Sequence, residues 1–324
     1  MTAQISQLTV AETASLTRGI TRLSVAVALV LSVMKLAAWA ASGSIAMLAS
    51  LADSGLDLLA AMITFFAVRY AATPADREHR YGHGKAEAFA SLLQAGLVFA
   101  SAALIADEAI THLLQPKPIS HEGWGMGVMG VSILMTGVLI YAQSRVLAQT
   151  RSVAVEGDRM HYGADLASNV IALVGIGASA VLCRSEPDAV GGLIVGGWLV
   201  WGAISVFRRA AFELMDHELP DAQRRRIATL MRADARVTGV HQMRTRASGP
   251  YVHIQVHADL EPGLSLVEAH QVMVAAEKRV LEAFPAADII IHPDPRGLAE
   301  PHGGAFGEGA EAHAAPAARQ RRTR

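Results

Sequence analysis

Two aspartates lie four residues apart in a stretch of the chain that is otherwise apolar. Asp53 and Asp57 fall within "ASLADSGLDLLAA", residues 49–61. Residues i and i+4 of a helix share a face, so both carboxylates point the same way. A charged aspartate at the centre of a membrane helix costs about 2.5–3.5 kcal/mol on insertion scales. Two such residues therefore need a compensating partner.

A second pair with the same spacing follows about a hundred residues later. His161 and Asp165 open the stretch "MHYGADLASNV", residues 160–170. Imidazole and carboxylate groups suit a borderline divalent ion such as zinc, and four ligands complete a tetrahedron. The simpler alternative is a set of buried carboxylates bonded to neighbouring helices, with Lys35 as the nearest counter-charge. Convergence of the two pairs on one ion is a hypothesis. For Gln94 and Asn169, the favoured interpretation is hydrogen bonding between helices.

Two further groups of ligand-type residues lie outside the apolar runs. In "PADREHRYGHGKAE", residues 74–87, the spacing of Asp76, His79 and His83 allows them to wrap one ion, although histidine-rich loops are often simply solvated. In the last third of the chain, His253 and His257 are an even number of residues apart on an expected strand and face the same side. That region also carries His241, His270, His292 and Asp294. A histidine in a strand is more often surface or core than ligand, but five ligand-type residues in one small region make metal binding as plausible as that alternative: His241, His257, His270, His292 and Asp294.

These residues are set in two regions of different composition. Apolar residues make up 52% of the 324 and aromatic residues only 5%, which suits an aliphatic membrane bundle joined to a soluble part. The single cysteine, Cys183, excludes an intrachain disulfide and any site with several cysteine ligands. The net charge of −1 gives no indication of nucleic-acid binding. Six apolar runs are long enough to span a bilayer as helices: about 20–42, 45–70, 86–114, 122–146, 153–183 and 188–208.

The distribution of Arg and Lys predicts the orientation of these spans. The breaks at about 69–85 and 145–159 are rich in Arg and Lys, whereas the short loops on the other side carry only Lys117 and Arg184. The positive-inside rule then places both termini in the cytoplasm. We expect an N-terminal cytoplasmic segment (1–15), a six-helix transmembrane domain (16–210), a cytoplasmic domain (211–295) and a disordered tail (296–324). The third part has the order helix, strand, strand, helix, strand, with Ser265 capping the second helix and Glu268 three residues later.

The combination of these motifs resembles the cation diffusion facilitator family, especially its bacterial branch that exports zinc and ferrous iron. The resemblance covers about residues 15–295 and rests on the stretches "LASLADSGLDLLAA", "PADREHRYGHGKAEAFASL", "RMHYGADLASN", "LMDHELPD", "RTRASGPYVHIQVH" and "FPAADIIIHPDP". It implies six membrane helices followed by a metallochaperone-like αββαβ domain, in a homodimer. It also implies proton-driven export of a divalent cation from the cytoplasm across the inner membrane, with Zn²⁺ expected and Fe²⁺, Cd²⁺ or Mn²⁺ as alternatives.

The resemblance also implies a role for each candidate residue. Asp53, Asp57, His161 and Asp165 match the transport site, and Asp76, His79 and His83 match the loop site. The match to a binuclear site at the dimer interface comprises His241, His257, His270, His292 and Asp294. Lys85 and Asp216 match a charge interlock that holds the membrane and soluble halves together at the dimer contact. His253 matches no role.

Two other classes of function are consistent with metal ligands in a membrane protein. An intramembrane metalloenzyme would need an open coordination position and a general base, but the sequence contains no HExxH motif and four ligands would close the site. A metal sensor or scaffold that does not transport would need only the cytoplasmic ligands. The four-residue membrane site therefore favours a transporter over both, and we expect no enzymatic activity.

Overall fold

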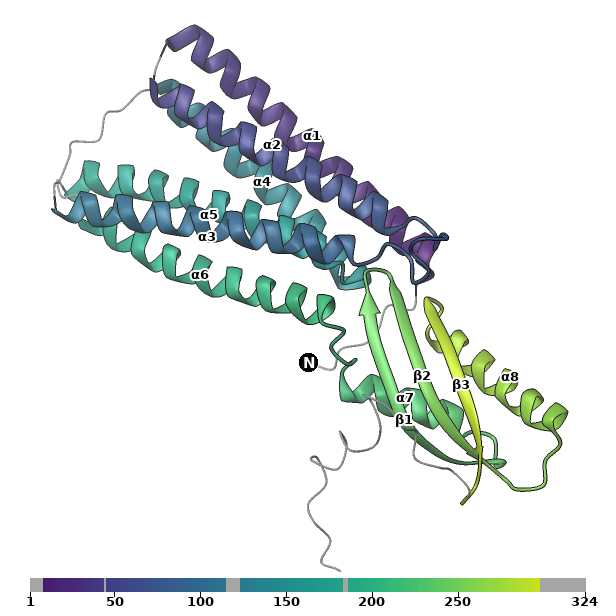
Figure 1. The fold of residues 1–324 in the computed structure, drawn as a ribbon. Helices are drawn as coiled ribbons and strands as arrows, with labels where there is room; N and C mark the ends of the chain where they lie inside the picture. The colour runs from purple at the N-terminus through teal and green to yellow at the C-terminus, as the bar shows by residue number, and fades with distance from the viewer. Residues whose placement is uncertain (1–7, 44, 115–122, 183–185, 298–324) are drawn as a thin grey trace, which may run out of the picture.

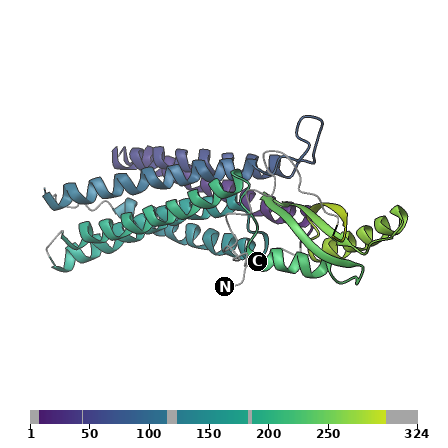
Figure 2. The same cartoon turned by 60° about the horizontal axis from the view of Figure 1, so that its bottom comes forward.

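The computed structural model describes residues 8–43, 45–114, 123–182 and 186–297. The predicted disordered tail lies outside these residues, apart from its first two positions. Two parts are evident: a bundle of long helices, and a small sheet with two shorter helices beyond one end of that bundle (Figures 1 and 2).

The helix bundle contains six long helices that run side by side (Figure 1). Their bounds are α1 Val10–Ser42, α2 Ile45–Ala71, α3 Ala86–Leu114, α4 Gly123–Thr150, α5 Val153–Leu182 and α6 Glu186–Leu214. Within the described part of the chain, five of them are long and apolar enough to cross a membrane, and α5 is not among these. In α5 the described side chains end at Ile171, apart from Val174, and this first part of the helix carries four charged residues: Glu156, Asp158, Arg159 and Asp165. The protein is therefore a multi-pass membrane protein, and a sixth crossing by α5 stays a prediction.

Helix α1 begins ten residues before the apolar run that we predicted at 20–42. Thr9 caps it, because its side chain accepts a hydrogen bond from the backbone N–H of Glu12, whose carboxylate bonds back to the backbone of Thr9. Thr13 and Thr17 in the first turns are buried. Hydropathy alone misses this part of the helix, because its buried face is polar. The helix thus includes residues that we had assigned to the N-terminal segment.

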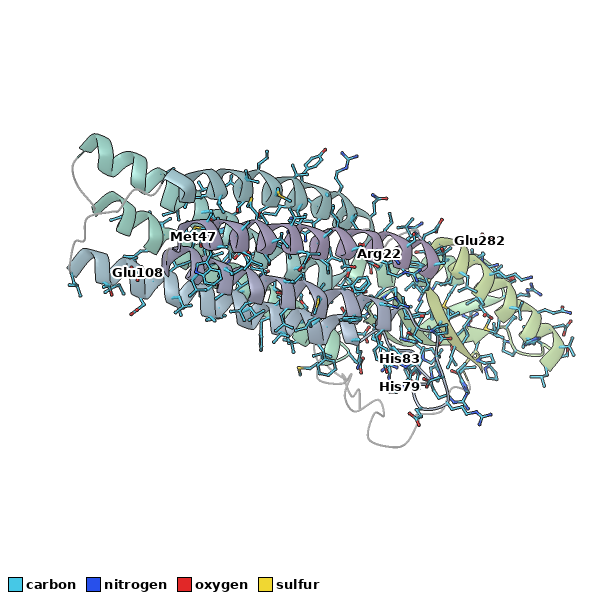
Figure 3. The ribbon with its side chains drawn as sticks, turned by 90° about the horizontal axis from the view of Figure 1, so that it is seen from above. Arg22, Met47, His79, His83, Glu108 and Glu282 are labelled. Atoms are coloured by element: carbon cyan, nitrogen blue, oxygen red, sulfur yellow. The ribbon has the colours of Figure 1, made fainter. Side chains whose placement is uncertain are left out.

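The two ends of the bundle differ in character (Figure 3). Met47 and Glu108 lie at the end far from the sheet domain, whereas Arg22 lies toward the near end, and His79 and His83 lie in the loop beside the sheet domain. The basic end is thus the end that carries the C-terminal domain. That this end faces the cytoplasm stays a prediction.

The C-terminal domain has the predicted order of helix, strand, strand, helix, strand. Its elements are α7 Asp221–Met231, β1 Val237–Ser248, β2 Tyr251–Leu260, α8 Leu266–Ala283 and β3 Ala287–Pro295. Strands β1 and β2 form an antiparallel hairpin, and β3 joins β2 in parallel after the crossover through α8. Ile227 of α7 and Val272 of α8 pack with Ile254 and Val256 of β2 in one core. Ser265 and Glu268 form the expected capping box of α8.

The strand register brings three histidines into one row across the sheet. His241 of β1 lies opposite His257 of β2, which in turn lies opposite His292 of β3. Directly paired residues point to the same side of a sheet, so the three imidazoles share a face. Because Ile254, Val256 and Ala258 alternate with the ligand-type residues of β2 and are buried in or beside the core, the histidine row lies on the face away from the helices.

Candidate metal centres

Three of the four membrane ligand candidates meet between α2 and α5. The Nε2 atom of His161 lies 3.1 Å from Oδ1 of Asp57 and 4.0 Å from Oδ2 of Asp165. One ligand atom from each of the three lies within 4.8 Å of the others, a spacing that fits a shared ion. The side chains are 6%, 13% and 21% exposed for His161, Asp57 and Asp165. The structure therefore brings Asp57, one member of the first i, i+4 pair, together with both members of the second pair.

Asp53 lies one turn from Asp57, outside the tight group of three but on the same cavity. This cavity has a volume of about 220 Å³, and its lining includes Asp53, Asp57, Asp165, Lys35 and Asn169. The Nζ atom of Lys35 donates a hydrogen bond to the backbone carbonyl of Ser50, at 3.3 Å. Lys35 thus forms part of the wall of the site, and its hydrogen bond within the described residues goes to a backbone carbonyl and not to a carboxylate.

Sequence reasoning missed a further acidic group on α5. Asp158 is fully buried, and its Oδ2 atom accepts a hydrogen bond of 2.8 Å from Nε2 of Gln143 on α4. The same Gln143 amide also donates to the hydroxyl of Ser24 on α1, at 3.2 Å. This network ties three helices together one turn from His161. The sequence offered one signal for it, since Asp158 lies three residues before the candidate ligand His161 and so on the same side of the helix.

Gln94 has the interhelical role that we favoured. Its Nε2 atom donates to the carbonyl of Ala60, at 3.2 Å, and to the hydroxyl of Thr64, at 2.9 Å, so it joins α3 to α2. Asn169 instead faces the cavity of the membrane site.

The loop between α2 and α3 brings Asp76, His79 and His83 together. Oδ2 of Asp76 lies 3.3 Å from Nε2 of His83, and Oδ1 lies 3.4 Å from Nδ1 of His79. The backbone N–H groups of His79 and Glu78 donate to the Asp76 carboxylate, and the His79 bond in particular holds the pKa of Asp76 below its usual value. Nδ1 of His83 lies 3.3 Å from the carbonyl of Thr73. A carbonyl only accepts, so this contact favours the tautomer that leaves Nε2 free for a metal.

The C-terminal domain gathers a third group on its sheet. His241, His257 and Asp294 each offer one ligand atom within 4.8 Å of the others. Asp294 is central: its carboxylate lies 2.8 Å from Nδ1 of His257, 3.5 Å from Nε2 of His241 and 3.3 Å from Nε2 of His292. A carboxylate bridging several imidazoles is the arrangement expected of a site for one or two divalent ions.

Two residues of this domain differ from the sequence-based expectation. His270 is exposed on α8 and does not join the group formed within the described residues of one chain. Asp259 was overlooked, although it follows His257 by two positions and so shares its face; its Oδ1 atom lies 3.4 Å from Nε2 of His241. His253 does face the same side as His257, but its Nδ1 atom lies 3.3 Å from the carboxylate of Asp288, and its ring meets Tyr81 edge-on.

The two residues of the predicted charge interlock form an ion pair within a single chain, and its place at a dimer contact stays a prediction. Nζ of Lys85 lies 3.0 Å from Oδ1 of Asp216, and Arg246 of β1 lies 3.1 Å from Oδ2. Partial burial alone would raise the pKa of the Asp216 carboxyl. Hydrogen bonds from Lys85 and Arg246, together with their positive charges, outweigh this effect, so the pKa is lowered. The backbone of Asp216 is left-handed, with φ of 55°. Asn tolerates this conformation nearly as well as Asp.

We expect Asp216→Asn to loosen this junction slightly at neutral pH. The carboxylate that both pairs share is 39% exposed, so the loss is less than about 1 kcal/mol, or up to about fivefold faster amide hydrogen exchange in residues 245–250. Because the folded pKa of Asp216 is lowered, its contribution is complete above the unfolded pKa of about 3.9 and fades as pH falls below it. Glu282→Gln, at an exposed acid of α8 in the same domain, should leave exchange in these residues unchanged. Equal exchange in Asp216→Asn and the unaltered protein would show that the interlock contributes no stability.

Comparison with known proteins agrees with this architecture. Residues 21–215 match the family model described as "Cation efflux transmembrane domain". The chain belongs to the cation efflux family, also called the cation diffusion facilitators. Residues 219–296 match "Cation efflux protein, cytoplasmic domain". Three similar proteins bear the name cation-efflux pump FieF. The one from Shewanella oneidensis is 42% identical, over 85% of this chain and 92% of its own length.

The other two come from Salmonella. The protein of Salmonella arizonae is 38% identical, over 83% of this chain and 90% of its own length. The protein of Salmonella schwarzengrund is 37% identical, over 87% of this chain and 93% of its own length. These similarities cover nearly the whole length of the pumps, so the family assignment applies to both the helix bundle and the C-terminal domain of this chain.

Proposed function

We propose that this cation efflux protein exports Zn²⁺ from the cytoplasm across the bacterial inner membrane in exchange for protons. The observation that carries the proposal is the group of Asp57, His161 and Asp165, whose ligand atoms lie within 4.8 Å of one another inside an apolar helix bundle. Asp53 on the same cavity supplies the fourth ligand once a metal ion draws the carboxylates together. The names of the similar pumps support cation efflux as the activity.

The donor set supports zinc over other ions. Zn²⁺ favours tetrahedral sites of nitrogen and oxygen ligands, whereas Mg²⁺ and Ca²⁺ favour six or more oxygens. Cd²⁺, Fe²⁺ and Mn²⁺ accept the same groups and remain competing substrates. The site has no Cys ligand, and thiolate or thioether ligands are those that select Cu⁺.

Proton exchange follows from the chemistry of the same ligands. A carboxylate or imidazole binds metal only in its deprotonated form, so protons and metal compete for one set of atoms. A site open to the outside releases metal as protons bind, and a site open to the cytoplasm loses those protons as metal binds. Alternating access between these two states couples the two fluxes in opposite directions.

We assign the two outer groups to capture and regulation, in a homodimer with both termini in the cytoplasm. Asp76, His79 and His83 bind one ion at the loop, and the sheet holds a binuclear site at the dimer interface. Its ligands are His241, His257, His270, His292 and Asp294. Lys85 and Asp216 join the two halves, and the loop with His79 and His83 lies at the end of the bundle that carries the C-terminal domain (Figure 3).

The test is transport by the purified protein in sealed lipid vesicles. One dye inside the vesicles reports metal and another reports pH, and Zn²⁺, Cd²⁺, Fe²⁺ and Mn²⁺ are offered in turn under an imposed pH gradient. We expect Zn²⁺ to move fastest, with a proton flux in the opposite direction that protein-free vesicles lack. Metal binding without movement would instead identify a sensor or scaffold. Metal movement without a change in pH would overturn the exchange.

A further inference from the structure

The wall of the membrane site contains a fixed positive charge among its carboxylates. Lys35 of α1 is buried at 9% exposure and lines the same cavity as Asp53, Asp57 and Asp165. Its charge acts on the carboxylates of Asp53 and Asp165. Its ammonium group donates a hydrogen bond to the carbonyl of Ser50, one turn before Asp53 on α2. The ammonium group is therefore held by a neutral acceptor on the wall of the acidic cavity.

This position is unexpected for a site that binds cations. A fixed positive charge close to a bound metal ion repels it, and the interaction is strong where water is scarce. A hydrogen bond between two helices through a backbone carbonyl requires no charge. A Ser or Gln side chain could donate it at a lower free-energy cost in a membrane. The presence of a lysine thus requires a reason that depends on its charge.

Charge balance supplies that reason. Asp53, Asp57 and Asp165 line the cavity, and once all three are deprotonated to bind a divalent ion, one negative charge would be left uncompensated at a depth where net charge is costly. The ammonium of Lys35 cancels that remaining charge, so the cavity with a divalent ion is neutral. We propose that Lys35 is a built-in counter-cation that sets the valence of the transport site and matches it to a divalent ion.

This inference rests on the proposed function, because it takes the cavity as the metal site. It makes Lys35 a specificity-determining residue that acts through charge and not as a ligand. Two consequences differ from those of a structural tie. Removal of the charge should strengthen metal binding, and it should strengthen binding of a trivalent ion more than that of a divalent one, since the repulsion removed scales with the charge of the ion.

The experiment compares Lys35→Met with Lys35→Arg in the full-length protein in detergent at pH 8, where protons compete least. Calorimetric titrations with Zn²⁺ and with Tb³⁺ measure both affinities, and the binding lost in Asp57→Asn identifies the membrane site against the other sites. We expect Lys35→Met to bind Zn²⁺ about tenfold more tightly or better, and to gain a larger factor for Tb³⁺. Lys35→Arg should retain the unaltered ratio of the two affinities.

The outcomes separate this inference from the proposed function. Weaker or unchanged Zn²⁺ binding in Lys35→Met, or equal gains for both ions, would overturn the role of the charge while leaving transport intact. A Zn²⁺ affinity of the unaltered protein that does not depend on Asp57 would overturn the site itself. Melting temperatures of both lysine variants show whether a loss of binding comes from misfolding, and in that case Lys35→Gln, which keeps a polar donor without charge, repeats the comparison.

Discussion

Asp57→Asn is expected to reduce metal transport at least about a hundredfold. Groups that only orient a metal ligand already contribute tenfold to a hundredfold to affinity, so loss of a direct anionic ligand should cost no less. The amide keeps the size of the side chain and so preserves the packing of α2. It removes the negative charge and replaces the carboxylate oxygen that lies 3.1 Å from Nε2 of His161. The proton flux coupled to the metal should disappear with it.

The measurement is initial Zn²⁺ uptake in vesicles with the pH signal recorded in parallel. Asp107→Asn is the matched control, because Asp107 is an exposed acid on α3 outside the three metal groups found in the described residues. It should transport at the unaltered rate. Full transport by Asp57→Asn would show that the transport site does not lie at Asp57, whether or not the loop and sheet groups bind metal.

Local spacing was enough to predict the pairs that form the membrane site. The i, i+4 rule fixes which face Asp53 and Asp57 share, and also which face His161 and Asp165 share, with no knowledge of tertiary structure. That α2 and α5 turn these faces toward each other depends on helix packing, which the spacing does not encode. Asp53 illustrates the difference: it shares the cavity but stands outside the tight group of three.

The same limit explains the residues that were misplaced or overlooked. Lys35 was considered as a counter-charge, but its bond to the Ser50 carbonyl depends on how α1 crosses α2. The row of His241, His257 and His292 depends on the register of three strands, which a bulge between His241 and Arg244 shifts. Periodicity within one strand predicts a shared face and not a partner across strands.

The junction between the two halves contains a close backbone contact that no sequence pattern announced. The hairpin of β1 and β2 meets the loop before α3 at Gly84, beside Lys85 of the interlock. A methyl group added at Gly84 would lie 1.9 Å from the carbonyl oxygen of Ser248 and 2.8 Å from its hydroxyl. On the other side of the contact, Gly249 donates its N–H to Oε1 of Glu213 on α6, at 2.6 Å. The tip of the hairpin is thus held by α6 and by the loop that carries Asp76, His79 and His83.

Gly84→Ala is accordingly expected to open this junction. The Ser248 carbonyl must retreat by about 1.5 Å, from 1.9 Å to the ordinary 3.4 Å, and the atoms in conflict belong to backbone that cannot rotate away. Overpacking of this kind costs about 1–3 kcal/mol, so amide exchange in residues 246–251 should accelerate about fivefold to a hundredfold. Gly96→Ala in α3, where an added methyl meets nothing within 4 Å, is the matched control.

The same variant separates metal binding from coupling between the halves. Gly84 does not line the membrane cavity, so Zn²⁺ affinity at Asp57 and His161 should not change. If the hairpin contact transmits movement between the C-terminal domain and α2 and α3, the maximal transport rate of Gly84→Ala falls several-fold at unchanged affinity. Transport at the full rate, together with accelerated exchange at the hairpin, would show that metal transport does not depend on this contact.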